Sequence, residues 1–228
     1  MKYFAYLLLT PLFLLLAFNM YAYGSIIGLR TLAPSSTAFM NTRMAQLAER
    51  KPEVKRDYRW VDYQDISPHL KKALIASEDA RFAVHGGFDW DGIRQAARRN
   101  RAQGEIRAGG STISQQLVKN LFLNEERSYW RKAEEAALTA ILEATTDKTR
   151  IYTLYLNVIE WGYGIYGAEA AAQHFYGVSA KQLNPRQAAA LAARVSAPLR
   201  YADQPNDPRL RRKTEIILKR MNSAKLPE

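Results

Sequence analysis

The sequence contains no cysteine and only three histidines among its 228 residues. Without cysteine there is no disulfide framework and no thiolate metal site, and three histidines leave little room for an all-imidazole metal centre. Acidic residues are also in the minority, because 22 Asp and Glu stand against 33 Lys and Arg, for a formal charge of +11. This excess indicates an anionic partner: nucleic acid, phospholipid head groups or a phosphorylated substrate. The length suits one compact domain with an appendage.

Charged residues are missing from about Tyr3 to Tyr23, where the run 7–16 is strongly apolar. About 20 residues rising roughly 1.5 Å each span the ~30 Å of a bilayer core, so a transmembrane anchor is predicted. The alternative is a cleaved signal peptide with its cleavage site near residues 22–24, although the apolar run is longer than a usual signal core. Basic residues flank the run on both sides, so they do not decide its orientation.

Strand-like alternation is scarce and there is no long internal repeat, which predicts a mostly α-helical chain. Residues 60–63 are expected to be extended, and the glycine- and aromatic-rich segment 161–167 is expected to be a loop that either stacks on sugar rings or turns a corner. Apolar spacing and capping residues predict helices over 67–85, 89–101, 126–144, 148–157, 168–176, 184–195 and 209–221, with a short helix after the turn at 34–37 and another after Ser111.

The most informative stretch closes the predicted helix 67–85. If this helix persists, Glu78, Phe82 and His85 fall on one side of it, and the glycine pair 86–87 ends it. A carboxylate beside an aromatic ring on a partly apolar face loses hydration, which raises its proton affinity toward that of a working acid or base. The alternative is a pair of acidic residues on the surface near a helix end.

A second informative stretch runs from Gly109 to Asn120. Its two glycines permit a loop that approaches a ligand closely, and Ser111 can cap the helix that follows. A free helix N-terminus with hydroxyls and a lysine favours a phosphate site, although the spacing of a nucleotide P-loop is absent. Paired glutamines suit hydrogen bonds to sugar hydroxyls or amides; the alternative is a plain polar face. The polar side would carry Thr112, Gln115 or Gln116, and Lys119, and the apolar side Ile113, Leu117 and Leu121.

Two neighbouring glutamates, Glu134 and Glu135, lie in the predicted helix 126–144. Glu134 falls near the centre of the expected buried stripe, and Glu135 falls at its edge beside Arg131. Periodicity therefore leaves open which glutamate faces a site, but it predicts one partly buried carboxylate within reach of Arg131. The expected stripe consists of Trp130, Ala137, Leu138 and Ile141.

Taken together, these blocks resemble the peptidoglycan glycosyltransferases, glycosyltransferase family 51, and in length the monofunctional members. The similarity covers about residues 39–201, with the motifs in the family's order. Ser114 stands where the family usually has threonine, and Gln187 where it usually has glutamate, which puts a structural ion pair there in doubt. The matching pieces are Glu78-Asp79-x-x-Phe82-x-x-His85-x-Gly87, Gly109-Gly110-Ser111-Thr112-Ile113-Ser114-Gln115-Gln116-Leu117-x-Lys119-Asn120, Arg131-Lys132-x-x-Glu135, Lys148-x-x-Ile151-x-x-x-Tyr155-Leu156-Asn157 and the alanine-rich block 188–193.

The resemblance implies a lysozyme-like helical domain with a smaller membrane-facing lobe. The expected division is a transmembrane anchor (1–24), a connector with a short helix (25–52) and a glycosyltransferase domain (53–228). The implied activity is polymerisation of lipid II, a disaccharide-pentapeptide on undecaprenyl pyrophosphate, by inverting transfer, for cell-wall biogenesis and cell shape. The alternative is a lysozyme-like lytic enzyme that cleaves finished glycan.

The same resemblance implies a location and partners. The expected location is the bacterial inner membrane, crossed once, with the catalytic domain on the periplasmic or extracellular face. Expected partners are lipid II, the growing glycan chain and the membrane, but not nucleic acid; proteins of cell-wall synthesis or division are left open. No cofactor is required by the sequence, and a divalent cation, Mg²⁺ or Mn²⁺, is left open.

Site roles follow from the resemblance as well. Glu78 is expected to be the general base that deprotonates the acceptor hydroxyl, and Glu135 a second catalytic carboxylate that holds cations or assists departure of the leaving group. Arginine and lysine side chains suit the departing pyrophosphate. The expected substrate-binding set is Asp79, Phe82, His85, Gly109, Gly110, Ser111, Thr112, Gln115, Gln116, Lys119, Asn120, Arg127, Arg131, Lys132 and Asn157, and no metal ligand is assigned.

Overall fold

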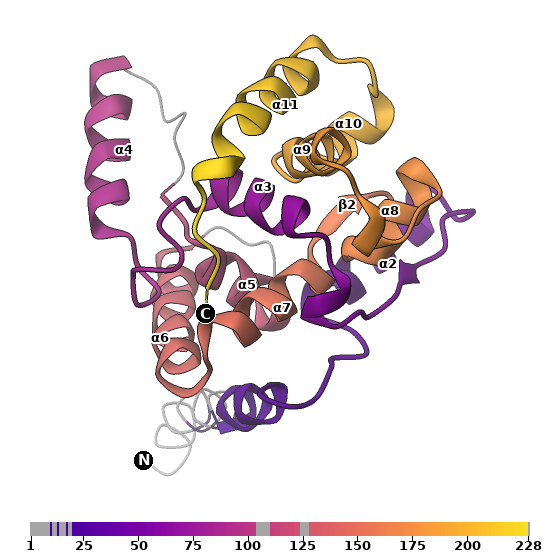
Figure 1. Cartoon of the computed structure of the whole chain (residues 1–228). Coiled ribbons are helices and arrows are strands. Elements are labelled where there is room, and N and C mark those ends of the chain that lie inside the picture. Colours follow the sequence, from indigo (N-terminus) through magenta and orange to yellow (C-terminus); the bar gives the residue numbers. More distant parts are fainter. Residues whose placement is uncertain are drawn as a thin grey trace, which may run out of the picture.

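The computed structural model describes residues 10, 13, 17, 20–103, 110–123 and 128–227. It is mostly helical, as the sequence predicted, and Figure 1 shows the helices with a small sheet at one side. Residues 20–29 are helical. The further elements are α2 (Ala38–Arg50), β1 (Asp57–Tyr58), α3 (Pro68–Glu78), α4 (Trp90–Gln103), α5 (Ile113–Phe122), α6 (Tyr129–Thr145), α7 (Lys148–Val158), β2 (Glu160–Gly162), β3 (Ile165–Tyr166), α8 (Ala168–Tyr176), α9 (Pro185–Arg194), α10 (Pro198–Asp203) and α11 (Pro208–Arg220), with 3₁₀ turns at Tyr63–Asp65, Ala180–Gln182 and Met221–Ser223.

Local capping explains where several helices begin. At α9, the Asn184 side chain accepts a hydrogen bond from the Gln187 amide at 2.9 Å, and the Gln187 side chain accepts one from the Asn184 amide at 3.0 Å. Pro185 occupies the first turn, where no amide donor is needed. Gln187, which departs from the family pattern, therefore closes a capping box at the helix N-terminus.

The core forms where two groups of helices meet. The helices α5, α6 and α7 pack against one another, and α3, α9 and α11 form the second group. Every residue of α7 from Ile151 to Val158 is buried. Figure 1 shows α9, α10 and α11 at one end of the molecule and the helical segment 20–29 at the opposite end. The helix α3 joins the two groups, because its C-terminal end reaches the region of α5.

A three-stranded sheet corrects two sequence expectations. The strand order is β1-β3-β2, with β1 parallel and β2 antiparallel to β3. The segment 161–167, expected as a loop, is a hairpin, and the extended piece expected at 60–63 lies instead at β1. Trp161 and Tyr166 are both fully buried. These two aromatic rings therefore fill the core, and a sugar ring cannot reach them to stack.

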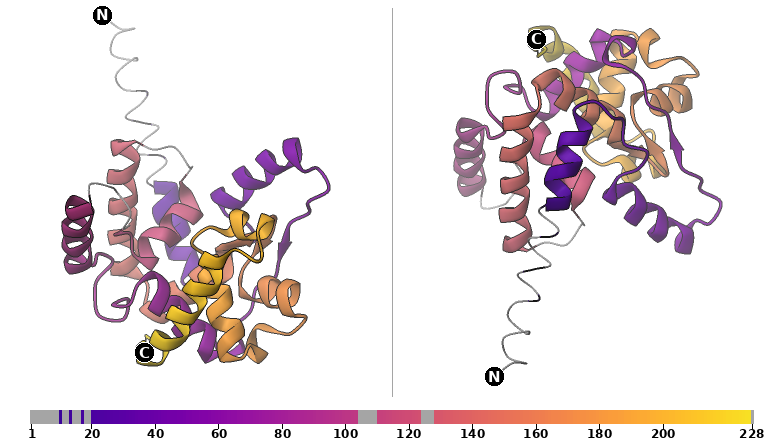
Figure 2. Two further views of the ribbon diagram at one scale, coloured as in Figure 1. Left: turned by 90° about the horizontal axis from the view of Figure 1, so that it is seen from above. Right: turned by 90° about the horizontal axis from the view of Figure 1, so that it is seen from below.

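The helical segment 20–29, which contains the end of the predicted anchor and the start of the connector, is docked on the domain. Ala22, Ile26 and Leu29 are buried, and Arg150 of α7 donates hydrogen bonds to the Leu29 and Leu32 carbonyls at 2.8 and 2.7 Å. Figure 2 shows this helical segment from both sides. Within the described ranges, no helix combines the length and apolar character needed to cross a membrane. Most of the predicted anchor lies outside those ranges, so it stays a prediction.

Candidate active site

The helix α3 ends at Glu78, seven residues earlier than the sequence predicted. Its last hydrogen bond runs from the Asp79 amide to the Ile75 carbonyl at 3.0 Å, after which the chain turns away. Glu78, Phe82 and His85 therefore do not share one helix face, and that expectation is wrong. The side chain that follows the helix end, Asp79, bonds to the Ile113 amide of α5 and to His85, and no pattern near residue 79 in the sequence indicates these partners.

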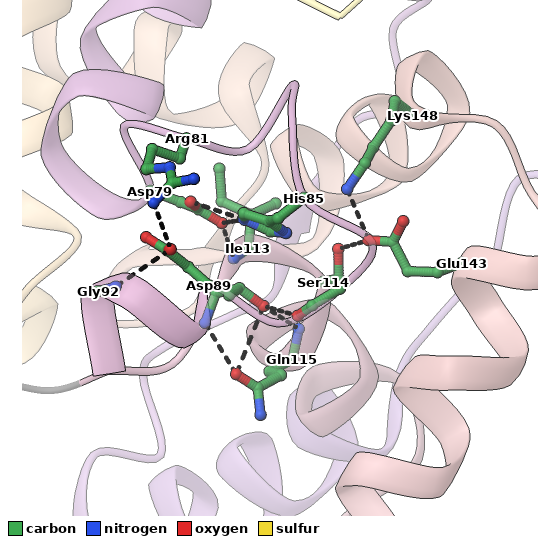
Figure 3. A network of polar contacts seen from close by, with 12 residues as sticks. Asp79, Arg81, His85, Asp89, Gly92, Ile113, Ser114, Gln115, Glu143 and Lys148 are labelled. Carbon is green, nitrogen blue, oxygen red and sulfur yellow. Dashed lines mark hydrogen bonds and ion pairs between the residues drawn. The ribbon is translucent and has the colours of Figure 1, made fainter. Parts of the chain in front are cut away.

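Asp79 joins three segments of the chain. Its Oδ2 accepts a hydrogen bond from the Ile113 amide at 3.0 Å, and His85 Nε2 lies 3.0 Å from both of its carboxylate oxygens. Figure 3 shows this network between the loop after α3 and the start of α5. Both side chains are almost fully buried. A carboxylate at a helix N-terminus also interacts favourably with the helix dipole.

The N-terminus of α5 is consequently not free. Thr112, rather than Ser111, is its N-cap, and Thr112 forms a capping box with Gln115. The Thr112 hydroxyl also donates to the Gly87 carbonyl at 2.6 Å. The phosphate site predicted here assumed a free helix N-terminus, whereas Asp79 and Thr112 already accept hydrogen bonds from the Ile113 and Gln115 amides.

Gly87 lets the loop pass close to α6. Its φ is +88°, and a Cβ there would lie 3.0 Å from Glu143 Cγ and 3.1 Å from Thr139 Cγ2. We expect Gly87→Ala to lower the free energy of unfolding by about 2 kcal/mol, because it combines a left-handed backbone with a steric contact. Gly86→Ala is the matched control, since a Cβ there meets no atom within 4 Å. Urea denaturation of both variants makes the measurement, and equal stability of the two would contradict the account.

Glu78 lies at the end of α3 with its side chain 13% exposed. Its carboxylate accepts hydrogen bonds from the Ser77 hydroxyl at 3.0 Å and from Gln116 Nε2 at 3.3 Å. Lys213 Nζ of α11 lies 3.8 Å from Oε1. The amide of Gln116 is itself held by the Tyr155 hydroxyl, which donates to its Oε1 at 3.1 Å. The carboxylate is thus oriented by groups from three elements and stays reachable from solvent.

The two hydrogen-bonded residues Glu78 and Gln116 line different pockets. Glu78 lines a small cavity of about 130 Å³ together with Asp89, Arg99 and Ser111, here called the Glu78 pocket. Gln116 lines a second cavity of about 320 Å³, here called the Lys119 pocket, which also borders Phe39, Arg43, Asn120, Glu160 and Arg200. The hydrogen bond between Gln116 and Glu78 therefore links a residue that lines the Lys119 pocket to the carboxylate that lines the Glu78 pocket.

The Lys119 pocket contains three cationic side chains, two of which are paired. Arg43 Nε lies 3.2 Å from a Glu160 oxygen, and Arg200 Nη2 lies 2.8 Å from Asp207 Oδ2. Lys119 forms no ion pair with any described residue. Its charge is therefore the one most available to an anionic ligand in this pocket.

Glu135, rather than Glu134, is the buried carboxylate of α6. It is 3% exposed and forms ion pairs with Arg131, at 3.2 Å, and with Lys132. Burial raises the pKa of the neighbouring Glu134 carboxyl, against the charge of Arg131. The prediction of one buried carboxylate beside Arg131 is confirmed. Glu135 does not border either pocket described above, so its geometry suits holding the two cations.

The expected buried stripe of α6 was wrong in part. Trp130 and Ala137 are exposed, whereas the buried positions are Glu135, Leu138, Thr139 and Leu142. The buried face is therefore rotated toward Glu135. A carboxylate can be buried when it is paired with two cations, as Glu135 is. The apolar pattern does not anticipate this, because it assigns the buried face to hydrophobic residues.

Several predicted substrate-binding residues instead serve the fold. The Asn157 side chain is fully buried and bonds to backbone groups of Val61 and Thr153. The Phe82 ring is also fully buried, against His85 and Tyr152 and beneath Lys148 Nζ at 4.4 Å. Neither side chain is exposed to a ligand in this structure.

Other predicted residues line one of the two pockets, and one of them also forms a hydrogen bond within α5. Gly110, Ser111 and Thr112 line the Glu78 pocket, and Asn120 lines the Lys119 pocket. Asn120 also donates to the Gln116 carbonyl at 2.8 Å. Gly109 and Arg127 lie outside the described residues.

Sequence reasoning missed several residues around the site. Lys213 of α11 lies near the Glu78 carboxylate, and Tyr155 of α7 bonds to Gln116; no spacing in the sequence signals either contact. Glu143 accepts hydrogen bonds from the Ser114 hydroxyl and from Lys148 Nζ, the latter at 2.8 Å. Ser114 therefore keeps the hydroxyl function that the family's usual threonine would supply. The presence of Ser114 and Lys148 in the family-like blocks was the available signal for this contact.

A metal-binding cluster is not found in the described part of the chain, where no three His, Cys, Asp or Glu side chains could hold an ion together. A requirement for a divalent cation therefore stays a question for solution experiments.

A partly shielded carboxylate that is hydrogen-bonded to a residue lining a cationic pocket suits acid–base chemistry on an anionic substrate. The family model described as Transglycosylase matches residues 43–222. Curated proteins named biosynthetic peptidoglycan transglycosylase from Neisseria meningitidis serogroup B and Neisseria gonorrhoeae are each 61% identical over 223 residues, 98% of this chain and 96% of theirs. Another from Neisseria meningitidis is 67% identical over 164 residues, 72% of this chain and 99% of its own.

This chain belongs to the transglycosylase family, and it is a glycosyltransferase enzyme. The resemblance stated from the sequence motifs is thereby confirmed.

Proposed function

We propose that this enzyme polymerises lipid II into the glycan strands of peptidoglycan by inverting glycosyl transfer and releases undecaprenyl pyrophosphate. The observation that carries the proposal is the hydrogen bond that links Glu78, which lines the Glu78 pocket, to Gln116, which lines the Lys119 pocket. A transferase needs two adjacent subsites, one for an acceptor sugar and one for a donor with its leaving group. A carboxylate near both subsites can take the proton of the acceptor hydroxyl as the glycosidic bond forms.

Glu78 acts as the general base in this scheme. The 4-hydroxyl of the acceptor N-acetylglucosamine attacks C1 of the donor N-acetylmuramic acid, and its proton passes to the Glu78 carboxylate. The bond from C1 to the pyrophosphate oxygen breaks, with inversion at C1. Hydrogen bonds from Ser77 and Gln116 orient the carboxylate without neutralising it, which supports the role of acceptor for a proton.

The leaving group needs charge stabilisation rather than a strong acid. Lys119 is the candidate for the pyrophosphate, since it has no ion pair among the described residues of its pocket. Arg131 and Arg127 are also proposed to bind the pyrophosphate. The proposal for Arg127 rests on the sequence motif alone. Glu135 keeps the head groups of Arg131 and Lys132 in place through its ion pairs.

Lys119→Ala tests the donor subsite. We expect the KM for lipid II to rise about tenfold or more, because a charge-assisted contact to phosphate contributes roughly 1.5–3 kcal/mol. Lys219→Ala makes the same change of charge on an exposed position of α11 and is the control. Steady-state kinetics with labelled lipid II gives both values. An unchanged KM in Lys119→Ala would remove the pyrophosphate assignment.

A membrane location follows from the substrate, since a polyprenyl chain stays in the bilayer. We propose a single-pass anchor in the inner membrane, with the catalytic domain on the periplasmic or extracellular face. The net charge of +11 favours anionic lipid head groups, and the exposed Tyr129 and Trp130 suit a membrane interface. Lipid II and the growing glycan chain are the proposed partners, and contacts with division or cell-wall synthesis proteins are left to experiment.

The alternative function is a lytic enzyme that cleaves finished glycan. Incubation of the full chain with lipid II and, separately, with cell-wall glycan distinguishes them. We expect longer glycan from lipid II and no fragments from the cell wall; fragments without polymer would reject the proposal. A chelator added to the lipid II reaction tests whether Mg²⁺ or Mn²⁺ is required.

A further inference from the structure

We propose that Tyr155 is a positioning residue, which fixes the side-chain amide of Gln116 so that its NH₂ group, and not its oxygen, faces Glu78. This inference rests on the proposed role of Glu78 as the base. Tyr155 touches neither pocket described above and acts only through Gln116.

The geometry is a chain of two hydrogen bonds. The Tyr155 hydroxyl donates to Gln116 Oε1 at 3.1 Å, and Gln116 Nε2 donates to Glu78 Oε2 at 3.3 Å. An amide has one acceptor end and one donor end, whereas an ionised carboxylate only accepts. A flipped amide would place its oxygen against the Glu78 carboxylate, which is repulsive. The Tyr155 hydroxyl favours the productive orientation because it engages the amide oxygen.

Tyr155 is well suited to this role because it cannot bond to solvent instead. Its side chain is fully buried, in a helix that is buried along most of its length. Burial, followed by the negative charge of Glu78, raises the pKa of the Tyr155 hydroxyl well above its ordinary value. The group therefore remains a protonated donor over the working pH range, and losing it would leave the Gln116 amide free to rotate.

Other groups also face the Glu78 carboxylate, and they bear on its pH dependence. They come from α3 itself, α5 and α11: Ser77 donates at 3.0 Å, Gln116 at 3.3 Å, and Lys213 Nζ lies 3.8 Å away. Asp79 is the next residue along the chain, and its carboxylate is turned to His85 and the start of α5. Among these groups Tyr155 bonds only to Gln116, so any effect of Tyr155→Phe on Glu78 passes through Gln116.

Tyr155→Phe is the test, and Tyr152→Phe is its matched control. Both hydroxyls are buried in α7, but that of Tyr152 donates to the Lys71 carbonyl at 2.5 Å and does not reach Gln116. We expect Tyr155→Phe to lower kcat about tenfold with KM nearly unchanged, because the oriented base acts on the chemical step. We also expect the acid limb of the pH–rate profile to move to higher pH, since the ionised carboxylate loses a donor. Tyr152→Phe should keep the wild-type kcat and profile.

The outcomes separate this inference from the proposed function. Glu78→Gln is measured in the same assay. If this variant is active, Glu78 is not the base, and the positioning role of Tyr155 is rejected as well. If Glu78→Gln is inactive while Tyr155→Phe and Tyr152→Phe share one kcat and one pH profile, the positioning role alone is overturned. Should Tyr155→Phe fold poorly, Gln116→Met removes the same donor at similar size. It is expected to shift the acid limb in the same direction, and an unshifted limb would overturn the inference.

Discussion

Replacing Glu78 with Gln should lower the turnover of lipid II by about 10²–10⁴-fold, the range attributed to a general base. Glutamine has nearly the shape of glutamate and can still accept hydrogen bonds from Ser77 and Gln116, so the fold should persist. It cannot take a proton from the acceptor hydroxyl. Initial rates with labelled lipid II measure the loss, and equilibrium binding of the same substrate should stay within about twofold, because the loss lies in the transition state.

The control for this variant is Glu49→Gln, which makes the same chemical change at an exposed position of α2. It should keep the wild-type rate. Near-normal turnover by Glu78→Gln would mean that another group, or none, accepts the proton.

Replacing Asp79 with Ala should lower the free energy of unfolding by about 3 kcal/mol. The substitution leaves the buried Ile113 amide and His85 Nε2 without their partner, and each unsatisfied buried group costs about 1–3 kcal/mol. Urea denaturation followed by circular dichroism measures the change. Activity should fall as well, because Asp79 connects the end of α3, which carries Glu78, to the start of α5.

Asp65→Ala is the comparison for Asp79. Asp65 forms an ion pair with Lys181 on the surface, where both side chains are well exposed. Pairs of this kind contribute about 0–1 kcal/mol, so the variant should be close to wild type. Equal effects at the two positions would contradict the assignment of Asp79 as a buried junction.

Local signals in the sequence predicted the parts of the fold that are decided locally. Asn184 before Pro185 marks the start of α9, and residues 168–176 form α8 with the predicted bounds. The same reasoning placed α3 correctly at its start, with Ser67 as N-cap, and failed at its end. Nothing near Asp79 in the sequence shows that its side chain bonds to Ile113, which is 34 residues away.

The residues of the site also fall into those that local sequence predicted and those that depend on tertiary packing. Motifs pointed to Glu78, Gln116 and Lys119, because each belongs to a recognisable block of sequence. They left out Lys213 and gave Tyr155 no role, because the contacts of both residues depend on how α11 and α7 pack against α3 and α5. Apolar periodicity also assigned the wrong face of α6, since it does not anticipate a buried ion-paired glutamate such as Glu135.

The most direct test of the central claim is the release of undecaprenyl pyrophosphate from lipid II and from an analogue whose acceptor 4-hydroxyl is replaced by hydrogen. With natural lipid II, the full chain should release one undecaprenyl pyrophosphate for each glycosidic bond formed. With the analogue alone it should release none, because no hydroxyl remains for Glu78 to deprotonate. Release from the analogue at the normal rate would show that water is the nucleophile, and would contradict the account.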